Sequence, residues 1–276
     1  MLLKFRIILT ILLFLLLLFF NLSVTGQSLP SGSRSTAMGR CSVAISDLWS
    51  TTNNPAGIAQ FEKPMIGIFY EHRFMLSELS NKSIAAVIPT KFGVFGSAYN
   101  HTGYNLFNRQ RIELVYSRFL GKHLSIGVQL NYIITSLGNN YGKKDNITFN
   151  VGLQSDVSEK VTLGAWIANP VGVKLADFND ETLPIVFRFG SLYKVNNFLD
   201  IVCEIEKNTL ILPLIVRCGI EYTINNRYFF RTGTSTNKEI FTFGVGITLK
   251  NFNMNISATM HDILGFSQQI GLNYSF

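Results

Sequence analysis

The stretch LSIGVQLNYI, residues 124–133, alternates apolar side chains with polar or small ones. Successive side chains of an extended strand point to opposite faces, so this pattern predicts a strand with one apolar and one polar face. The apolar set is Leu124, Ile126, Val128, Leu130 and Tyr132. The same alternation recurs in residues 147–153, 240–249, 253–260 and 267–276, which indicates an all-β chain.

The alternation runs from Pro64 to the end of the chain and predicts about fourteen strands. Very short connections, such as 121–122 and 196–197, alternate along the chain with longer ones, such as 136–146 and 169–184. Tight turns at one end and longer loops at the other are typical of an up-and-down barrel in an outer membrane. The expected strands are 65–73, 81–90, 92–101, 108–119, 122–135, 145–156, 159–169, 183–194, 197–206, 213–224, 227–235, 238–249, 251–261 and 265–276.

A soluble β-sandwich would show a similar alternation, because it buries one face of each sheet. The apolar faces here are unusually aromatic, with 23 phenylalanines, and only 15% of all residues are charged. The expected strands are also long enough to cross the hydrocarbon core at a tilt. We therefore expect a transmembrane antiparallel up-and-down β-barrel, closed because lipid satisfies no backbone hydrogen bond.

The chain begins with the pattern of a secretory leader. Lys4 and Arg6 precede an apolar run at 7–20, and the small residues Val24 and Gly26 suit cleavage. An uncleaved anchor is the alternative, although a spanning helix usually needs about 20 apolar residues. The expected segments are a cleaved signal peptide at 1–26, a plug at 27–63 and the barrel at 64–276, with the mature protein in the outer membrane of a Gram-negative cell.

Composition excludes several classes of function. Loss of Lys4 and Arg6 with the leader lowers the formal net charge from +7 to +5, and no basic block offers a nucleic-acid footprint. The four histidines are scattered without metal-ligand spacing, and no Ser–His–acid set is supported. We expect no enzyme activity, no metal and no cofactor.

The cysteines Cys41, Cys203 and Cys218 are too few and too uneven for a disulfide framework. Cys203 and Cys218 fall on the apolar faces of neighbouring predicted strands. They are expected to be small hydrophobic residues facing lipid, and a cross-strand disulfide is the alternative.

A barrel of this width encloses a channel or a plug. Glycines on the predicted lumen face would let a second backbone approach closely. They are Gly127, Gly152, Gly164, Gly190, Gly219, Gly233, Gly244, Gly246 and Gly271. Residues 27–63 are the only sizeable segment left to fill the lumen, the alternative being a disordered periplasmic tail. Within them Asn53 or Asn54 can cap a short helical turn that has Pro55 in its first position.

The run SGSRSTAMGRCSVAISDLWSTTNNPAGIA resembles the N-terminal signature of the FadL-like outer-membrane barrels, most closely their PorV/PorQ branch in the Bacteroidetes. The matching positions are Ala37, Met38, Gly39, Val43, Ala44, Asn54, Pro55, Ala56 and Gly57, and Asn53 precedes them in the plug motif. The resemblance implies a fourteen-stranded barrel with an N-terminal hatch in its lumen. Arg40 and Cys41 depart from the small residues usual in the family.

Charged residues fall on the predicted lumen faces of the strands between 183 and 231. Opposite charges on neighbouring strands can pair across the ladder. They form an expected lumen charge network of Arg188, Asp200, Glu204, Glu206, Arg217, Glu221 and Arg231. Its role is either structural, to satisfy buried charge, or functional, to guide a ligand or contact the hatch.

The last residues, GLNYSF, place Tyr274 and the terminal Phe276 on one face. This pattern resembles the terminal strand that outer-membrane barrels present to their assembly machinery. An ordinary last strand that happens to end in phenylalanine is the alternative. Expected partners are therefore outer-membrane lipid and the assembly machinery.

Two functions follow from the resemblance. The main expectation is an accessory subunit of a secretion or outer-membrane assembly complex, because the outer loops are short and the lumen is lined with glycine. The alternative is a FadL-like passive transporter of hydrophobic small molecules.

Overall fold

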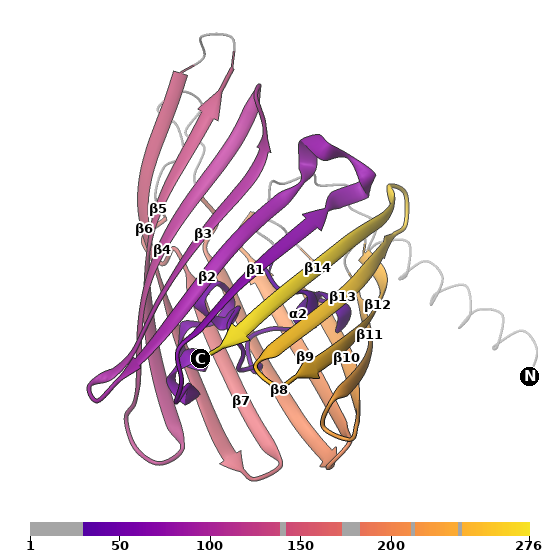
Figure 1. Cartoon of the computed structure of the whole chain (residues 1–276). Helices are drawn as coiled ribbons and strands as arrows, with labels where there is room; N and C mark the ends of the chain where they lie inside the picture. Colours follow the sequence, from indigo (N-terminus) through magenta and orange to yellow (C-terminus); the bar gives the residue numbers. More distant parts are fainter. Residues whose placement is uncertain (1–29, 139–141, 173–182, 211–212, 237–238) are drawn as a thin grey trace, which may run out of the picture.

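Strands with one apolar face close into a barrel in the computed structural model (Figure 1), which describes residues 30–138, 142–172, 183–210, 213–236 and 239–276. Each of the fourteen antiparallel strands pairs with its neighbours in sequence, and β1 pairs with β14 to close the sheet. The predicted fold is confirmed. The predicted signal peptide lies outside the described residues.

The observed strands lie close to the expected bounds. The largest departures are the end of β3 and the starts of β6 and β8, and the start of β6 at Gly142 shortens the loop expected at 136–146. The strands are β1 Met65–His72, β2 Asn81–Thr90, β3 Gly93–Tyr104, β4 Phe107–Phe119, β5 Leu124–Leu137, β6 Gly142–Ser158, β7 Val161–Ala168, β8 Val186–Asn196, β9 Leu199–Asn208, β10 Ile215–Ile224, β11 Tyr228–Ser235, β12 Glu239–Leu249, β13 Phe252–His261 and β14 Gly265–Ser275.

The two faces of the wall differ as the alternation predicts. On β5, the outward Leu130 is 51% exposed while its inward neighbour Gln129 is 1% exposed. The outward face is a nearly continuous apolar surface, as a lipid-facing wall requires. Short turns connect the strands at one end of the barrel. Asn225 and Asn226 link β10 to β11 with φ of 53° and 51°, the conformation of a tight hairpin turn.

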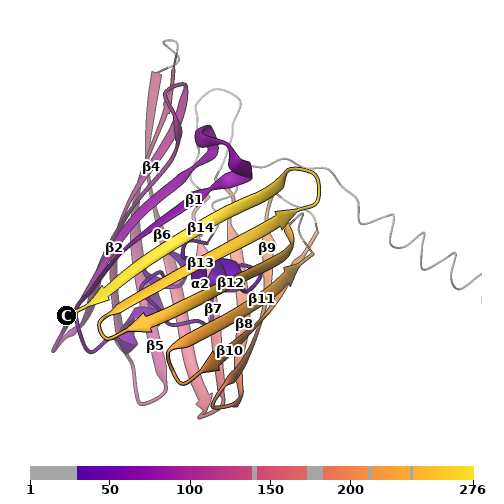
Figure 2. The same ribbon diagram turned by 45° about the vertical axis from the view of Figure 1, so that its right-hand side comes forward.

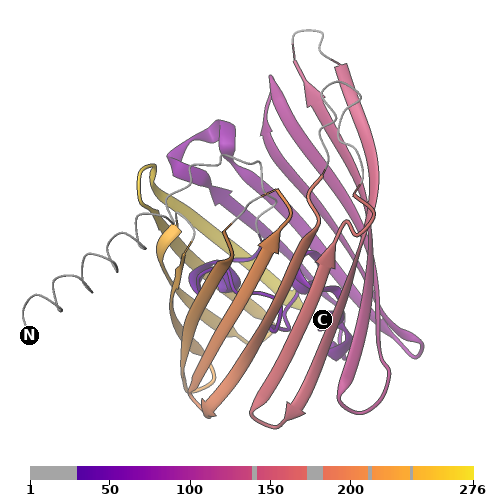
Figure 3. The same cartoon turned by 180° about the vertical axis from the view of Figure 1, so that it is seen from behind.

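Residues 30–63, called the plug below, lie inside the barrel (Figures 2 and 3). They form three short helices, α2 Ser33–Ala37, α3 Ser50–Asn53 and η1 Pro55–Gln60. Two further turns, η2 Arg73–Met75 and η3 Ser77–Leu79, connect β1 to β2. No helix among the described residues is long and apolar enough to span a membrane.

Lumen-facing glycines set how closely the plug approaches the wall. Gly127 and Gly152, paired across β5 and β6, contact the backbone or side chains of Asn54 and Pro55. Of the nine glycines expected to admit a second backbone, all but Gly246 have plug atoms among their nearest neighbours. The predicted close approach of the plug is thereby confirmed for eight of the nine, and Gly246 instead lies against Arg231 and Asn255.

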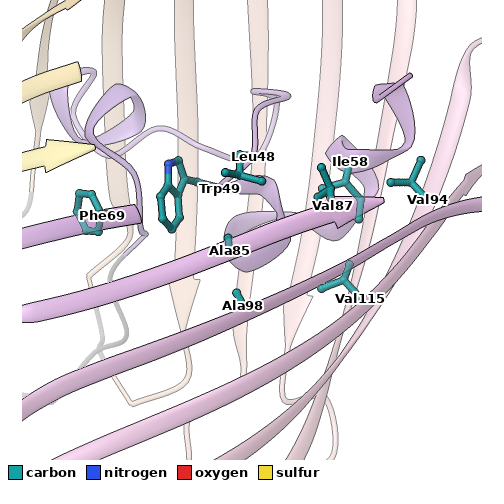
Figure 4. Packing of buried hydrophobic residues seen from close by; sticks show 9 residues of the cluster. All are labelled: Leu48, Trp49, Ile58, Phe69, Ala85, Val87, Val94, Ala98 and Val115. Carbon is teal, nitrogen blue, oxygen red and sulfur yellow. The ribbon is translucent and has the colours of Figure 1, made fainter. Parts of the chain in front are cut away.

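An apolar cluster joins the plug to the first four strands (Figure 4). Leu48, Trp49 and Ile58 of the plug pack against lumen-facing side chains of β1 to β4. The Trp49 and Phe69 rings lie 5.5 Å apart at a tilt. Burial of this surface stabilises the plug inside the lumen by the hydrophobic effect. The wall residues of the cluster are Phe69, Ala85, Val87, Val94, Ala98 and Val115.

Candidate functional site

The turn at Asn54 ties the plug to itself and to the wall. Asn54 Oδ1 accepts a hydrogen bond from the Ala56 N–H at 3.2 Å, and Pro55 follows as the first residue of η1. Proline loses no hydrogen bond at that position. Asn54 Nδ2 donates to the carbonyl oxygens of Val43 at 2.5 Å and of Leu153 on β6 at 3.2 Å.

Asn53 has a different role. It exchanges two hydrogen bonds with the Ser31 backbone, at 3.0 and 2.8 Å, and so holds the first described residues of the plug beside α3. The Gly57 N–H donates to the Asn54 carbonyl at 3.0 Å, and the Ala56 carbonyl accepts from Ser117 Oγ on β4 at 3.3 Å. Asn54, rather than Asn53, is therefore the capping residue.

The Met38–Gly39 turn contacts the lumen face of a different part of the barrel, at β10 and β12. The Gly39 N–H donates to Thr242 Oγ1 on β12 at 2.8 Å, and that hydroxyl donates to the Ala37 carbonyl at 2.9 Å. Gly39 has a φ of 69°, a conformation that favours glycine. Met38 is buried against Gly219 of β10.

Four of the predicted lumen charges form one cluster. Arg217 on β10 contacts Glu204 at 3.1 Å and Glu206 at 2.9 Å, both on β9. Arg188 on β8 contacts Glu206 at 2.7 Å and lies over the Trp166 ring. These contacts satisfy charges that would be costly if left unpaired in the lumen.

Glu204 also binds the plug. Its Oε2 atom accepts hydrogen bonds from the backbone N–H groups of Ser42 at 2.7 Å and Val43 at 2.8 Å. Charge-assisted hydrogen bonds of this kind are stronger than neutral ones. The cluster therefore satisfies buried charge and also contacts the hatch, while a role in guiding a ligand stays a prediction.

Two more predicted charges form a second cluster with a plug arginine. Arg34 of α2 makes two hydrogen bonds to the Glu221 carboxylate, at 2.9 and 2.6 Å. Arg231 on β11 pairs with the same carboxylate and donates to Asn255 at 2.8 Å. Asp200 lies opposite Glu221 in the ladder, but within the described residues no ion pair joins it to this network.

Arg40, which departs from the small residues of the family pattern, binds the wall. Its Nη2 lies 2.6 Å from Glu71 on β1, and both side chains are almost fully buried. Glu71 also accepts a hydrogen bond from Gln269 on β14 at 3.2 Å. A buried arginine in a segment of small residues requires a carboxylate partner, so the lumen-facing Glu71 was the available signal.

Glu113 is a further wall residue that the sequence did not single out. Its carboxylate accepts from Thr52 of α3 at 2.7 Å and lies 2.5 Å from Arg111. Asn100 on β3 donates to the same carboxylate at 3.2 Å. We call Glu71, Glu113, Glu204 and Glu221 the plug-binding carboxylates, because each contacts the plug from a different part of the wall.

Asp47 is an acidic residue of the plug. Burial raises the pKa of Asp47 above its usual value, while Arg34 opposes the shift. The Trp49 N–H donates to Asp47 Oδ1 at 2.9 Å. Asp47 therefore shapes the turn before α3 rather than binding the wall.

The outer wall carries the predicted assembly residues. Tyr274 lies between Phe252 and Phe276, with ring centroids 4.8 and 5.0 Å away. The Phe276 N–H donates to the Pro64 carbonyl at 3.0 Å, where the plug joins β1. An apolar hollow of about 640 Å³ also lies on this wall, where mainly outward-facing side chains of β13, β14, β1, β2 and β3 line it, so it faces lipid.

The sequence matches no protein-family model, and no curated protein matches it. Solved structures do match. The toluene transporter TodX of Pseudomonas putida is 12% identical with a TM-score of 0.69, and the match covers 90% of this chain and 99% of that one. The chain has the fold of a FadL-type barrel. The toluene transporter TbuX of Ralstonia pickettii is 14% identical, with a TM-score of 0.68 over 90% and 99% of the two chains.

A FadL homologue of Pseudomonas aeruginosa matches with a TM-score of 0.61 at 11% identity, over 89% of this chain and 98% of that one. TodX and TbuX are both named as toluene transporters. The main functional expectation, an accessory subunit of a secretion or assembly complex, is therefore wrong.

Proposed function

We propose that this protein is a passive outer-membrane channel for hydrophobic small molecules. The observation that carries the proposal is the match, over about nine-tenths of the chain, to barrels named as toluene transporters. The plug supports the proposal, because only hydrogen bonds and ion pairs are seen to hold it to the wall at these sites. Such contacts can break and re-form without any change in covalent bonds. The leader at 1–26 would export the chain, and the lipid-facing wall would place it in the outer membrane.

Transport of an apolar solute down its concentration gradient needs no metal and no cofactor, and the proposal assigns none. The placement near the PorV/PorQ branch stays a prediction that rests on the signature within residues 37–57.

Uptake by whole cells tests the proposal. The full chain would be expressed in a Gram-negative host that lacks its own hydrophobic-compound channel, and uptake of radiolabelled toluene and of a long-chain fatty acid would be measured. We expect faster uptake of at least one compound than in cells with an empty vector. Equal rates, with the barrel shown to be present in the outer membrane by heat-dependent gel migration, would contradict the proposal.

A further inference from the structure

Two cysteines lie face to face on the outer wall. Cys203 of β9 and Cys218 of β10 are direct partners in the ladder, and their Sγ atoms are 2.9 Å apart. Both are free thiols in this structure, and both project from the lipid-facing side. Proximity alone does not decide whether the two can be joined, because that depends on the type of ladder position.

Cys203 and Cys218 occupy the type of ladder position that a disulfide can bridge. The Thr223 N–H donates to the Phe198 carbonyl at 2.8 Å, which makes these two residues a hydrogen-bonded pair. Hydrogen-bonded and non-hydrogen-bonded pairs alternate along an antiparallel ladder. Cys218 lies an odd number of residues before Thr223, so Cys203 and Cys218 form a non-hydrogen-bonded pair. The Cα atoms of such pairs are about 4.5 Å apart, within the range that a disulfide spans.

The third cysteine cannot compete for either partner. Cys41 belongs to the plug and is 2% exposed, in a cluster that includes Val202 on the lumen face of β9. Cys203 is adjacent to Val202 and therefore points to the opposite side of the wall. The sheet separates Cys41 from both outward-facing thiols. Within one chain, Cys203 and Cys218 can therefore form a disulfide only with each other.

We propose that Cys203 and Cys218 are a modification site and are joined by a cross-strand disulfide, a step that rests on the predicted export of the chain. A thiolate of one cysteine attacks the disulfide of a periplasmic thiol–disulfide oxidoreductase and forms a mixed disulfide. The second thiolate displaces the enzyme sulfur. The protein loses two protons and two electrons, and the oxidoreductase is left with two thiols.

The position of the pair fixes when this step occurs. Both thiols lie within the strands, on the face that contacts lipid, so a water-soluble oxidoreductase reaches them only before the barrel is inserted. The two strands are consecutive, which lets the β9–β10 hairpin bring the cysteines together in the periplasm. Oxidation therefore accompanies assembly and is not reversed in the finished barrel.

The bond would strengthen the wall where the plug is bound. Cys203 precedes Glu204, which holds the plug at Ser42 and Val43, and Cys218 follows Arg217, which pairs with Glu204. A covalent link between the outward residues would hold the inward residues in register. The disulfide thus acts on the lipid side and supports a plug contact on the lumen side.

Counting thiols tests the proposal on the full chain purified from outer membranes. The protein would be unfolded in denaturant without reductant and treated with a polyethylene-glycol maleimide, which adds a visible mass to each free thiol. We expect one addition, at Cys41, before reduction and three after it. Three additions before reduction would overturn the proposal.

Three variants assign the linkage. Cys41→Ser should show no addition before reduction and two after it. Cys203→Ser and Cys218→Ser should each show two additions before reduction, because each frees its partner. Peptide mapping of the unreduced wild-type protein should find Cys203 linked to Cys218, and a link from either residue to Cys41 or to a second chain would overturn the assignment.

Discussion

Single glycines determine how deeply the plug can lie against the wall. A side chain at Gly219 would place its Cβ 2.5 Å from Met38 Cβ and 2.6 Å from the Met38 carbonyl oxygen, while Gly121, in a short turn, has open space around it. Polar residues then fix the plug, because each plug-binding carboxylate accepts a hydrogen bond from the plug or pairs with a plug arginine. Close approach and charge thus act together at the same interface.

The Gly219→Ala substitution should loosen the plug. Overpacking of a close contact costs about 1 to 3 kcal/mol, so we expect the buried Cys41 to become reactive toward a water-soluble maleimide about tenfold faster or more. The rate of labelling of the folded protein in detergent measures this. Gly121→Ala is the matched control and should label at the wild-type rate. Equal labelling of all three proteins would show that Gly219 does not seat the plug.

Replacement of Glu71 by methionine should destabilise the protein more than replacement of both partners. The single change removes the carboxylate that pairs with the buried Arg40 guanidinium, and loss of one partner of a buried ion pair costs about 3 to 5 kcal/mol. The double variant, Arg40→Met with Glu71→Met, removes both partners of this ion pair and should recover much of the loss. Urea unfolding in lipid vesicles measures both, and a double variant no more stable than Glu71→Met would contradict this account.

At the scale of the strand, alternation alone predicts most of the architecture. The period of two seen in residues 124–133 is local, so it locates a strand and its faces without knowledge of any partner. The plug contacts could not be predicted in this way. Ser42 and Glu204 are 162 residues apart, and their contact depends on how the plug is rotated within the closed barrel. Asp200 shows the same limit, because its place on the lumen face does not determine whether it forms an ion pair, and none joins it to the network among the described residues.

The last strand offers a test of the predicted assembly signal. We expect Phe276→Ala to lower the amount of barrel in the outer membrane several-fold while leaving refolding in detergent unchanged, because recognition acts only in the cell. Phe252→Ala is the matched control, since Phe252 packs against Tyr274 in the same aromatic group but is not terminal. Immunoblots of outer-membrane fractions measure the amounts. A similar loss for both variants would indicate a packing role rather than a signal.

At the scale of the whole molecule, the barrel is continuous and its lumen holds a plug attached on several sides. Pairing runs through all fourteen strands, and contacts from β1, β4, β9, β10 and β12 reach the plug. Passage of a solute through the lumen therefore requires the plug to move. The apolar cluster at Trp49 resists this movement on one side, and the polar contacts resist it elsewhere.

A covalent lock between plug and wall tests this requirement. Ser33 of α2 faces Gly271 of β14, and a Cβ built on Gly271 would lie 3.8 Å from Ser33 Cβ, the separation typical of a disulfide. In a Cys41→Ser background, Ser33→Cys with Gly271→Cys should cross-link on oxidation and reduce uptake of the transported compound to that of cells without the channel. Reductant should restore it.

The single variants Ser33→Cys and Gly271→Cys control for the substitutions themselves and should respond to neither oxidant nor reductant. The design uses a site where the plug is close to the wall, and Ser33 Oγ has no hydrogen-bond partner among the described residues that the substitution would remove. If the cross-linked barrel still admitted solute at the unlinked rate, the plug would not gate the lumen. The solute would then have to cross the wall without displacing α2.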